Sequence, residues 1–314
     1  MKTVLLTAVG SASAAAALQS LRALGCRVVG CDIYPREWNH VSTEVDAFFQ
    51  ALPVTDEAAY VAQLMDAVQR EGVDWLIPLT DVEVDVLCAC KDRFAVLGCT
   101  VCVPDEPVTR LCRNKLRMAQ ALADVCRTIP TFVPYDGCAD AFDYPLMLKP
   151  QSGRSSQGQR VVHDAAACRA ALAVRDDLIA QPFICGDVFT VDVARDRFGN
   201  VQALARRELL RTVNGLGTTV RVLPDHPLEQ VCADIAQAVQ LVGVVNMEFI
   251  VNRDGAYFLE VNPRFSGGIG FSCAAGLDLP ALQLQCFEGK AIGPRPALRP
   301  VTVTRRISPI ITEF

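Results

Sequence analysis

Histidine and tryptophan are scarce in this chain of 314 residues, which has three histidines and two tryptophans. The histidines stand in no triad-like context and no Gly-x-Ser-x-Gly turn is present, so nothing predicts a side-chain nucleophile. No apolar run approaches the ~20 residues that a membrane-spanning helix needs. Lysine and arginine number 30 against 35 acidic residues and form no basic cluster. We therefore expect neither a nucleic-acid partner nor a membrane partner.

Apolar residues, by contrast, are abundant. They make up 51% of the chain, enough for large cores and, at ~100–200 residues per domain, for two or three domains. The first residues are strand-like and not arranged as a secretion signal, so we expect a cytoplasmic protein. The 14 cysteines are expected to be small buried side chains, because disulfide frameworks belong to small secreted chains. The spacing of Cys88, Cys90, Cys99 and Cys102 is poorly suited to zinc.

Strand and helix patterns alternate over the first third of the chain. The predicted strands are 3–9, 27–31, 74–78 and 100–103, and the predicted helices are 13–24, 60–70 and 82–93. The first strand, helix and strand form a right-handed βαβ unit. We therefore predict an α/β domain with a doubly wound parallel sheet over residues 1–105.

Beyond residue 105 the pattern changes to α+β, with antiparallel hairpins. The predicted strands are 146–149, 160–163, 178–183, 189–195, 201–207, 244–251 and 257–261, and the predicted helices are 106–123, 165–174 and 228–242. We divide this part of the chain into two units, 106–186 and 187–314.

The turn after the first strand carries only part of the fingerprint of dinucleotide-binding domains. Gly10 matches the first of three glycines, but alanines stand at the other two positions, including the one where backbone must approach a pyrophosphate. Asp32, at the end of the second strand, remains a ribose candidate, but an exposed acid at a strand end is the simpler interpretation. We therefore do not expect a dehydrogenase and look for phosphate chemistry elsewhere.

The most informative stretch is the hairpin near the C-terminus, where Glu248 and Glu260 interrupt apolar strands. If Gly255 takes the left-handed position of a three-residue turn, Glu248 faces Glu260 directly and Asn262 points to the same side. Opposed carboxylates destabilise a sheet by up to roughly 1 kcal/mol unless a cation lies between them. Two carboxylates and an amide oxygen suit Mg²⁺ or Mn²⁺, and Arg264 follows on the loop, where it could bind a phosphoryl group.

These residues resemble the metal-binding end of the ATP-grasp superfamily. Glu248, the string 260–264 and the following Phe-Ser-Gly-Gly carry the resemblance, which is closer to the carbamoyl-phosphate-synthetase-like branch of stand-alone ligases and covers nearly the whole chain. It implies an N-terminal α/β domain with a doubly wound parallel sheet, followed by an α+β ATP-grasp core with a small lid subdomain. The lid subdomain would be 106–186 and the core 187–314.

The resemblance also implies a nucleotide site. Lys115 and Lys149 resemble the two nucleotide lysines of the family, although Asn114 stands where the family usually has aspartate. Lys149 ends a buried strand, and a lysine in that place fits a phosphate partner. The loop 152–158, with Arg154, resembles the glycine-rich lid over the phosphates. The remaining residues expected at the nucleotide are Ser155 and Ser156 of this loop, Gln181, Phe183 and Ile184 of the adenine hinge, and Asp187 as a ribose acid.

The segment 206–219 resembles the part of the family that supplies arginines to the acyl-phosphate region, and Arg207 and Arg264 are the preferred pair. The implied reaction is an ATP- and Mg²⁺-dependent ligation: a carboxylate attacks the γ-phosphate to give an acyl phosphate and ADP, and an amine then attacks the acyl carbon. The implied substrates are small amino-acid-like carboxylates and amines, and a homodimer is allowed. Two alternatives stay open: a carbamoyl-phosphate-synthetase-type enzyme, which uses two such cores, and a non-catalytic nucleotide-binding regulatory protein.

Overall fold

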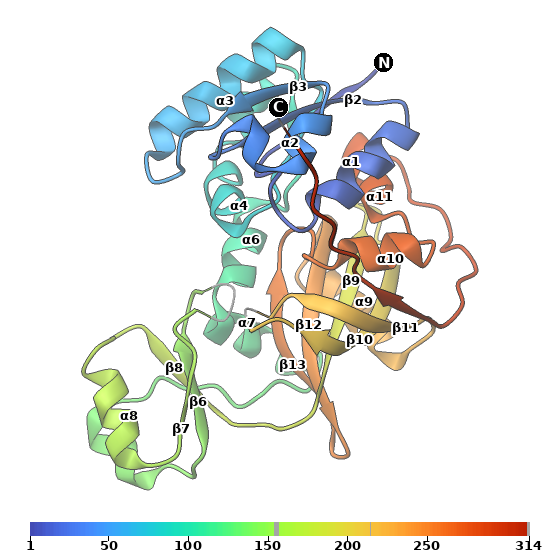
Figure 1. Cartoon of the computed structure of the whole chain (residues 1–314). Helices are drawn as coiled ribbons and strands as arrows, with labels where there is room; N and C mark the ends of the chain where they lie inside the picture. Colours follow the sequence, from blue (N-terminus) through green and yellow to red (C-terminus); the bar gives the residue numbers. More distant parts are fainter. Residues whose placement is uncertain (154–156, 214, 313–314) are drawn as a thin grey trace.

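Three β-sheets organise the chain (Figure 1). The computed structural model describes residues 1–153, 157–213 and 215–312. In the view of Figure 1 the N-terminal domain lies at the top, the large sheet lies below it, and a small lid subdomain lies apart at the lower left. None of the helices in these described ranges is long and apolar enough to cross a membrane.

The N-terminal domain is a five-stranded parallel sheet in the order β3-β2-β1-β4-β5. Alternate residues of β1 pack on opposite faces of the sheet: Leu6 joins a core with α1, whereas Leu5 joins a core with α3 and α4. Its elements are β1 (Thr3–Leu6), α1 (Ala14–Ala23), β2 (Arg27–Asp32), η1 (Arg36–Trp38), α2 (His40–Glu44), β3 (Ala47–Gln50), α3 (Glu57–Glu71), β4 (Trp75–Ile77), α4 (Asp81–Leu87), α5 (Lys91–Ala95) and β5 (Thr100–Val101). The predicted doubly wound sheet is confirmed, but the single helix expected over 82–93 is two short helices.

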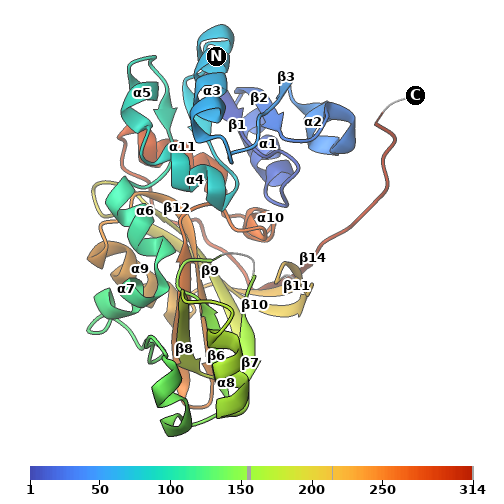
Figure 2. The ribbon, with the colours of Figure 1, turned by 90° about the vertical axis from the view of Figure 1, so that its left-hand side faces the viewer.

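The lid subdomain follows two helices that run down from the N-terminal domain (Figure 2). The helix expected over 106–123 is broken at Asn114, because the Asn114 side chain accepts the N–H of Arg117 and caps a new helix. The lid sheet is antiparallel, in the order β7-β6-β8. The elements are α6 (Glu106–Arg113), α7 (Lys115–Ala121), η2 (Asp136–Ala141), β6 (Leu146–Pro150), β7 (Arg160–Val162), α8 (Ala165–Leu172) and β8 (Leu178–Pro182).

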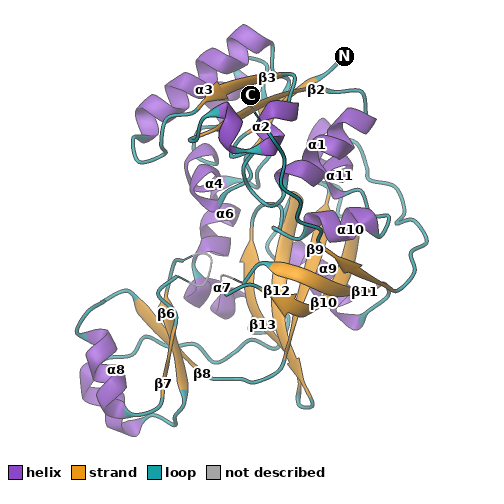
Figure 3. Ribbon diagram, in the orientation of Figure 1, coloured by secondary structure: helices purple, strands orange, loops and turns teal. Residues whose placement is uncertain are grey.

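The rest of the chain forms a six-stranded antiparallel sheet in the order β13-β12-β9-β10-β11-β14 (Figure 3). The helix α9 covers one face of it over an apolar core. The other face of the sheet is apolar at one end, where Leu204 and Val222 pack against α1, α10 and α11. The N-terminal domain and the large sheet therefore share one core. The elements are β9 (Asp187–Arg195), β10 (Val201–Arg211), β11 (Gly217–Leu223), α9 (Pro227–Ala238), β12 (Gly243–Asn252), β13 (Gly255–Asn262), α10 (Ile269–Ala274), α11 (Leu279–Glu288) and β14 (Val301–Thr304).

Candidate active site

The remaining end of this second sheet face is polar, because the pairing of the strands sets polar residues in two neighbouring rows. One row runs Glu260, Glu248, Thr190 and Arg206 across β13, β12, β9 and β10. The next row, two residues along each strand, runs Asn262, Asn246 and Asp192. Directly paired residues point to the same side of a sheet, so both rows face the same space.

The hairpin reaches this arrangement by a different route from the predicted one. Asn252 pairs with Gly255, so the turn has two residues, and a bulge at Leu259 then shifts the register by one. The shift restores the pairing of Glu248 with Glu260. The expected three-residue turn is therefore wrong and the expected opposition of the two glutamates is confirmed, since a bulge inserts the residue that the turn lacks.

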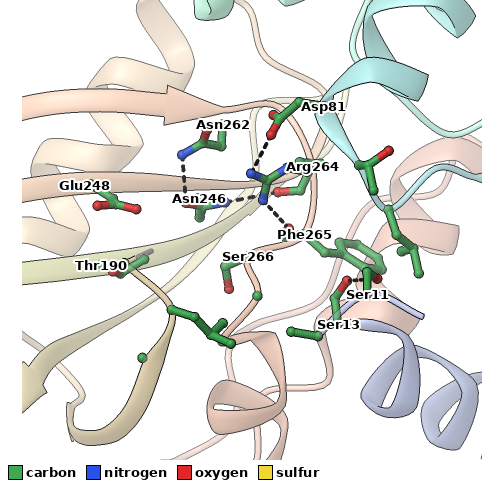
Figure 4. A pocket seen from close by; sticks show the side chains of 18 of the residues that line it. Ser11, Ser13, Asp81, Thr190, Asn246, Glu248, Asn262, Arg264, Phe265 and Ser266 are labelled. Carbon is green, nitrogen blue, oxygen red and sulfur yellow. Dashed lines mark hydrogen bonds and ion pairs between the residues drawn. The ribbon is translucent and has the colours of Figure 1, made fainter. Parts of the chain in front are cut away.

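A cavity of about 430 Å³ lies over the polar rows (Figure 4). Two loops of the N-terminal domain form its opposite wall, at the carboxyl ends of β1 and β4. These two strands are neighbours from which the sheet order runs in opposite directions, and such switch points are where open α/β sheets place ligands. The charged residues that line the cavity are Asp81, Arg206, Glu208, Arg211, Glu248, Glu260 and Arg264.

Lys115 and Lys149 lie beside Glu260, where they line a small extension of the site under the glycine-rich loop. The ammonium of Lys115 is 3.3 Å from Glu260 Oε2 and donates to the carbonyl of Gly153 at 3.2 Å. Lys149 is 4% exposed and has no hydrogen-bond or ion-pair partner among the residues that the structure describes. Burial lowers the pKa of Lys149 to about 8, although Glu260 opposes this shift. A buried ammonium without a partner is costly, and a phosphate would supply the partner.

The two opposed glutamates differ in their ionisation. Burial, and then the charge of Glu260, raise the pKa of Glu248. Burial also raises the pKa of Glu260, but Lys115 and Lys149 outweigh it, so the net pKa of this carboxyl is lowered. The Glu248 carboxylate is held only by Arg211, at 3.3 Å between Nη2 and Oε2, within the described residues.

The donor set fits a hard divalent cation, which would offset the repulsion that raises the pKa of Glu248. Asn262 donates to Glu260 Oε1 at 3.3 Å and to Asn246 Oδ1 at 3.2 Å, so its own amide oxygen is left available to a cation. No group of three or more His, Cys, Asp or Glu side chains able to hold a metal is found in the described ranges. The predicted cation ligands are instead two carboxylates and one amide: Glu248, Glu260 and Asn262.

The arginine that enters the site from β10 is Arg206, whereas Arg207 points away from the cavity. Arg206 is 2% exposed and bonds Asp192, Glu208 at 3.2 Å and Ser266 at 3.1 Å. Neighbouring strand residues face opposite sides, so Arg207 lies on the far surface and pairs with Asp187 at 2.8 Å. The structure thus brings neither Arg207 nor Asp187 to this cavity, and Arg206 and Arg211 take that position instead.

Arg264 lines the cavity, as expected from its place after β13. Its Nη2 donates to Asp81 at 2.7 Å and its Nη1 to the carbonyl of Phe265 at 2.9 Å (Figure 4). Asp81 comes from the N-terminal domain, 183 residues away in the chain, so no local sequence signal identifies this partner.

The predicted adenine hinge follows the edge of the lid sheet. Gln181 is buried in β8 and donates to Thr131 Oγ1 at 2.7 Å, so its side chain has a structural partner. Phe183 is 40% exposed, and its N–H bonds the carbonyl of Pro145, while Ile184 follows it directly. Arg154, Ser155 and Ser156 lie outside the described residues. Their roles stay predictions.

Asp32 is buried and not exposed, which corrects the sequence interpretation of an exposed strand-end acid. It accepts the backbone N–H of Gly10 at 2.7 Å and that of Tyr34 at 3.1 Å. One carboxylate oxygen therefore holds the loop after β1 and the other holds the turn after β2, as a structural role requires.

The sequence interpretation did not single out Asp81 or Arg113, which lies beside it. Arg206, Glu208 and Arg211 lie in the segment that was expected to supply arginines, but Arg207 was preferred there. For Arg206 and Glu208, the alternation along β10 was the available signal: both share the face of Leu204, and Arg207 does not.

Comparisons with known proteins agree with this arrangement. A family described as "ATP-grasp in the biosynthetic pathway with Ter operon" matches residues 174–309, and "PylC-like, N-terminal domain" matches residues 4–102. A D-alanine–D-alanine ligase of Pediococcus pentosaceus is 31% identical over an alignment of 144 residues that covers 39% of this chain and 39% of its own. The carbamoyl phosphate synthase large chain of Agathobacter rectalis is 23% identical over 52% of this chain and 17% of its own. The matched parts are thus well under half of these relatives.

Solved structures share the fold over nearly the whole chain. Biotin carboxylase of Campylobacter jejuni has a TM-score of 0.76 and 18% identity over 93% of this chain and 72% of its own. The biotin carboxylase domain of 2-oxoglutarate carboxylase from Hydrogenobacter thermophilus, a dimer in complex with MgADP, ADP and bicarbonate, has a TM-score of 0.74 and 19% identity over 92% of this chain and 70% of its own. From the fold, the polar rows and the two family matches together, we conclude that residues 174–309 belong to an ATP-grasp core and residues 4–102 to a PylC-like N-terminal domain.

Proposed function

We propose that this protein is an ADP-forming ligase that activates a small carboxylate with ATP and joins it to an amine. The observation that carries the proposal is the opposition of Glu248 and Glu260 on one polar sheet face, with Lys115 and Lys149 beside them. Acidic and basic groups so arranged can hold a triphosphate and its counter-ion together. The D-alanine–D-alanine ligase relative, which forms an amide, favours ligation over simple hydrolysis.

Each part of the site has a task in this reaction. Lys115 and Lys149 neutralise phosphate oxygens, and Glu248, Glu260 and Asn262 would hold Mg²⁺ or Mn²⁺. When bound, that cation stabilises the charge that develops on the phosphates. Arg264 and Arg211 face the cavity with guanidinium N–H groups that could bind the transferred phosphoryl group or the acyl phosphate.

The chemistry itself needs no side-chain nucleophile. The oxygen of the bound carboxylate attacks the γ-phosphorus, ADP leaves, and the amine displaces phosphate from the acyl carbon. The protein contributes by holding these groups in line and by excluding water between the two walls of the cavity. The N-terminal wall, with the hydroxyls of Ser11 and Ser13 and the loop at Thr80, faces the position where the acceptor would bind.

The test is ADP and phosphate release by the purified protein with ATP, Mg²⁺ and pooled amino acids. We expect release that depends on both the pool and Mg²⁺, and its loss in Glu260→Ala. As a matched control, Glu44→Gln removes an exposed acid of α2 and should leave release unchanged. Undiminished ADP formation by folded Glu260→Ala would contradict the assignment.

Two alternatives are separated by the same assay. A carbamoyl-phosphate-synthetase-type enzyme would release ADP with bicarbonate and an amine donor, and the match to 17% of that relative's length makes it the weaker candidate. A regulatory protein would bind ATP without turnover. Assembly as a homodimer is also proposed, by analogy with the dimeric Hydrogenobacter domain, and sedimentation equilibrium tests it.

A further inference from the structure

Asp81 receives guanidinium groups from two distant parts of the chain. It stands in the first turn of α4, in the N-terminal wall of the cavity, and is 3% exposed. Arg264 donates to its Oδ2 at 2.7 Å, and Arg113, at the end of α6, donates to its Oδ1 at 3.3 Å. The two arginine side chains are 17% and 13% exposed, so neither ion pair is much weakened by solvent.

On one side, Asp81 connects to the root of the glycine-rich loop. Nη1 of Arg113 also lies 3.5 Å from the carbonyl oxygen of Gly153, and the ammonium of Lys115 donates to the same oxygen at 3.2 Å. Lys115 in turn pairs with Glu260 at 3.3 Å. With the ion pair between Asp81 and Arg113, four contacts therefore lead from Asp81 to a predicted cation ligand through the lid side of the site.

On the other side, Asp81 connects to the same ligands through the core sheet. The carbonyl of Arg264 accepts from Asn246 at 3.3 Å, and Asn246 Oδ1 accepts from Asn262 at 3.2 Å. A ring of polar contacts thus surrounds the region between the lysines and the glutamates. Asp81 is the member of this ring that the N-terminal domain supplies.

The contacts of Asp81 determine what it can do. Each of its carboxylate oxygens accepts a hydrogen bond from a guanidinium, so the group is poorly placed to take a proton from an amine. A carboxylate between two arginines instead restricts their rotamers and keeps them close to each other in spite of their like charge.

We propose that Asp81 is a positioning residue for the ligase reaction, which holds Arg264 so that its remaining N–H groups face the phosphoryl group in transfer. The inference rests on the proposed function and extends it: the N-terminal domain takes part in phosphoryl transfer through a carboxylate that touches neither ATP nor the acyl group. Formation of the interface between the domains is then required for catalysis as well as for substrate binding.

The first test compares Asp81→Asn with Asp85→Asn. Asp85 stands one helical turn further along α4 and pairs with Arg113 at 2.9 Å, while no contact with Arg264 is found in the described ranges. We expect Asp81→Asn to lower kcat for ADP release by roughly 100-fold and to raise KM for ATP by no more than about tenfold, because a displaced arginine affects the transition state most. Asp85→Asn should keep kcat within about threefold of the parent. Equal kcat values for the parent and a folded Asp81→Asn would overturn the proposal.

The second test asks whether Asp81 acts through Arg264. In an Arg264→Lys background, Asp81→Asn should change kcat by less than about twofold, since the positioned guanidinium is already gone. A merely structural role would lower kcat by the same factor in both backgrounds. Such multiplicative effects would refute the positioning role even if both single variants are slow.

A binding measurement separates this inference from the proposed function. By calorimetry with Mg²⁺, Asp81→Asn should bind a non-hydrolysable ATP analogue about tenfold more weakly and ADP unchanged, because Arg264 acts at the terminal phosphate. If the parent releases no ADP with any substrate pool, the proposed function fails, and this affinity ratio still decides the role of Asp81. An unchanged ratio would refute it.

Discussion

At the scale of single residues, the site is governed by the compensation of buried charge. Lys115 and Lys149 lie against Glu260 and hold its pKa below the usual value, whereas burial and the charge of Glu260 raise the pKa of Glu248 in spite of Arg211. The sequence singled out both glutamates and Lys149 because charged residues that end or interrupt buried strands are rare without a function. Lys115, at the start of α7, was expected there only from the family resemblance. The sequence misassigned Arg207, because neighbouring arginines differ only in the face to which the strand turns them.

Lys149 predicts a pH-dependent affinity for nucleotide. With its pKa at about 8 in the free protein, the ammonium loses its proton as the pH rises above 8, whereas a bound phosphate favours the charged form and raises that pKa. Binding of ADP with Mg²⁺ should therefore take up as much as one proton near pH 9, and affinity should fall by at most about tenfold per pH unit above 8.

The measurement is calorimetry at pH 9 in two buffers with different ionisation enthalpies. Lys149→Arg is the matched control, because arginine stays charged throughout this range and should bind without proton uptake. The same proton uptake by parent and variant would show that another group titrates.

At the scale of elements, the hairpin of β12 and β13 shows which structural features the sequence pattern can predict. The three-residue turn assumed at Gly255 predicted that Glu248 would oppose Glu260, and the structure has this pairing. The turn could not be predicted, because a three-residue turn and a two-residue turn with a bulge at Leu259 give the same pairing beyond the bulge. Helix breaks were missed for a similar reason: the cap formed by Asn114 interrupts a continuous helical periodicity.

We expect that the hairpin turn does not tolerate substitution of Gly255. Its φ of +131° is strained for any L residue, and a Cβ there would lie 3.0 Å from Nη1 of Arg127, which also bonds the carbonyl of Asp254. Gly255→Ala should lower the free energy of unfolding by about 1–2 kcal/mol. Gly293→Ala, at a glycine with no atom within 4 Å of the new Cβ and no positive φ, should change it by less than about 0.5 kcal/mol.

Urea denaturation of the two variants beside the parent measures the difference. The comparison also tests the observed turn, because a glycine with ordinary backbone angles would tolerate alanine. Equal stability of Gly255→Ala and Gly293→Ala would therefore favour a different hairpin geometry.

At the scale of the whole molecule, the N-terminal domain and the large sheet share a hydrophobic core, and the lid subdomain has a separate one. Leu6 and Leu21 of the N-terminal domain belong to the same core as Leu204 and Val222 of the large sheet, whereas the lid subdomain has a small core of its own. The order of strand and helix patterns predicted the parallel N-terminal sheet and the change to α+β. The packing of the two across the active site depends on contacts such as Asp81 with Arg264, which no local pattern encodes.

This division predicts the order in which parts of the molecule open. The lid core has eight buried residues under a sheet whose strands are three to five residues long, so it should unfold at a lower free energy than the rest. The strand β1, although just as short, shares its core with the large sheet and should open together with β12.

Native-state hydrogen exchange with increasing denaturant compares the amides of β6 with those of β1 and β12. Exchange from β6 should need the least denaturant, and β1 and β12 should follow one common curve. Exchange from β1 ahead of β12, in step with β6, would mean that the N-terminal domain folds on its own and that the wall carrying Asp81 can separate from the site.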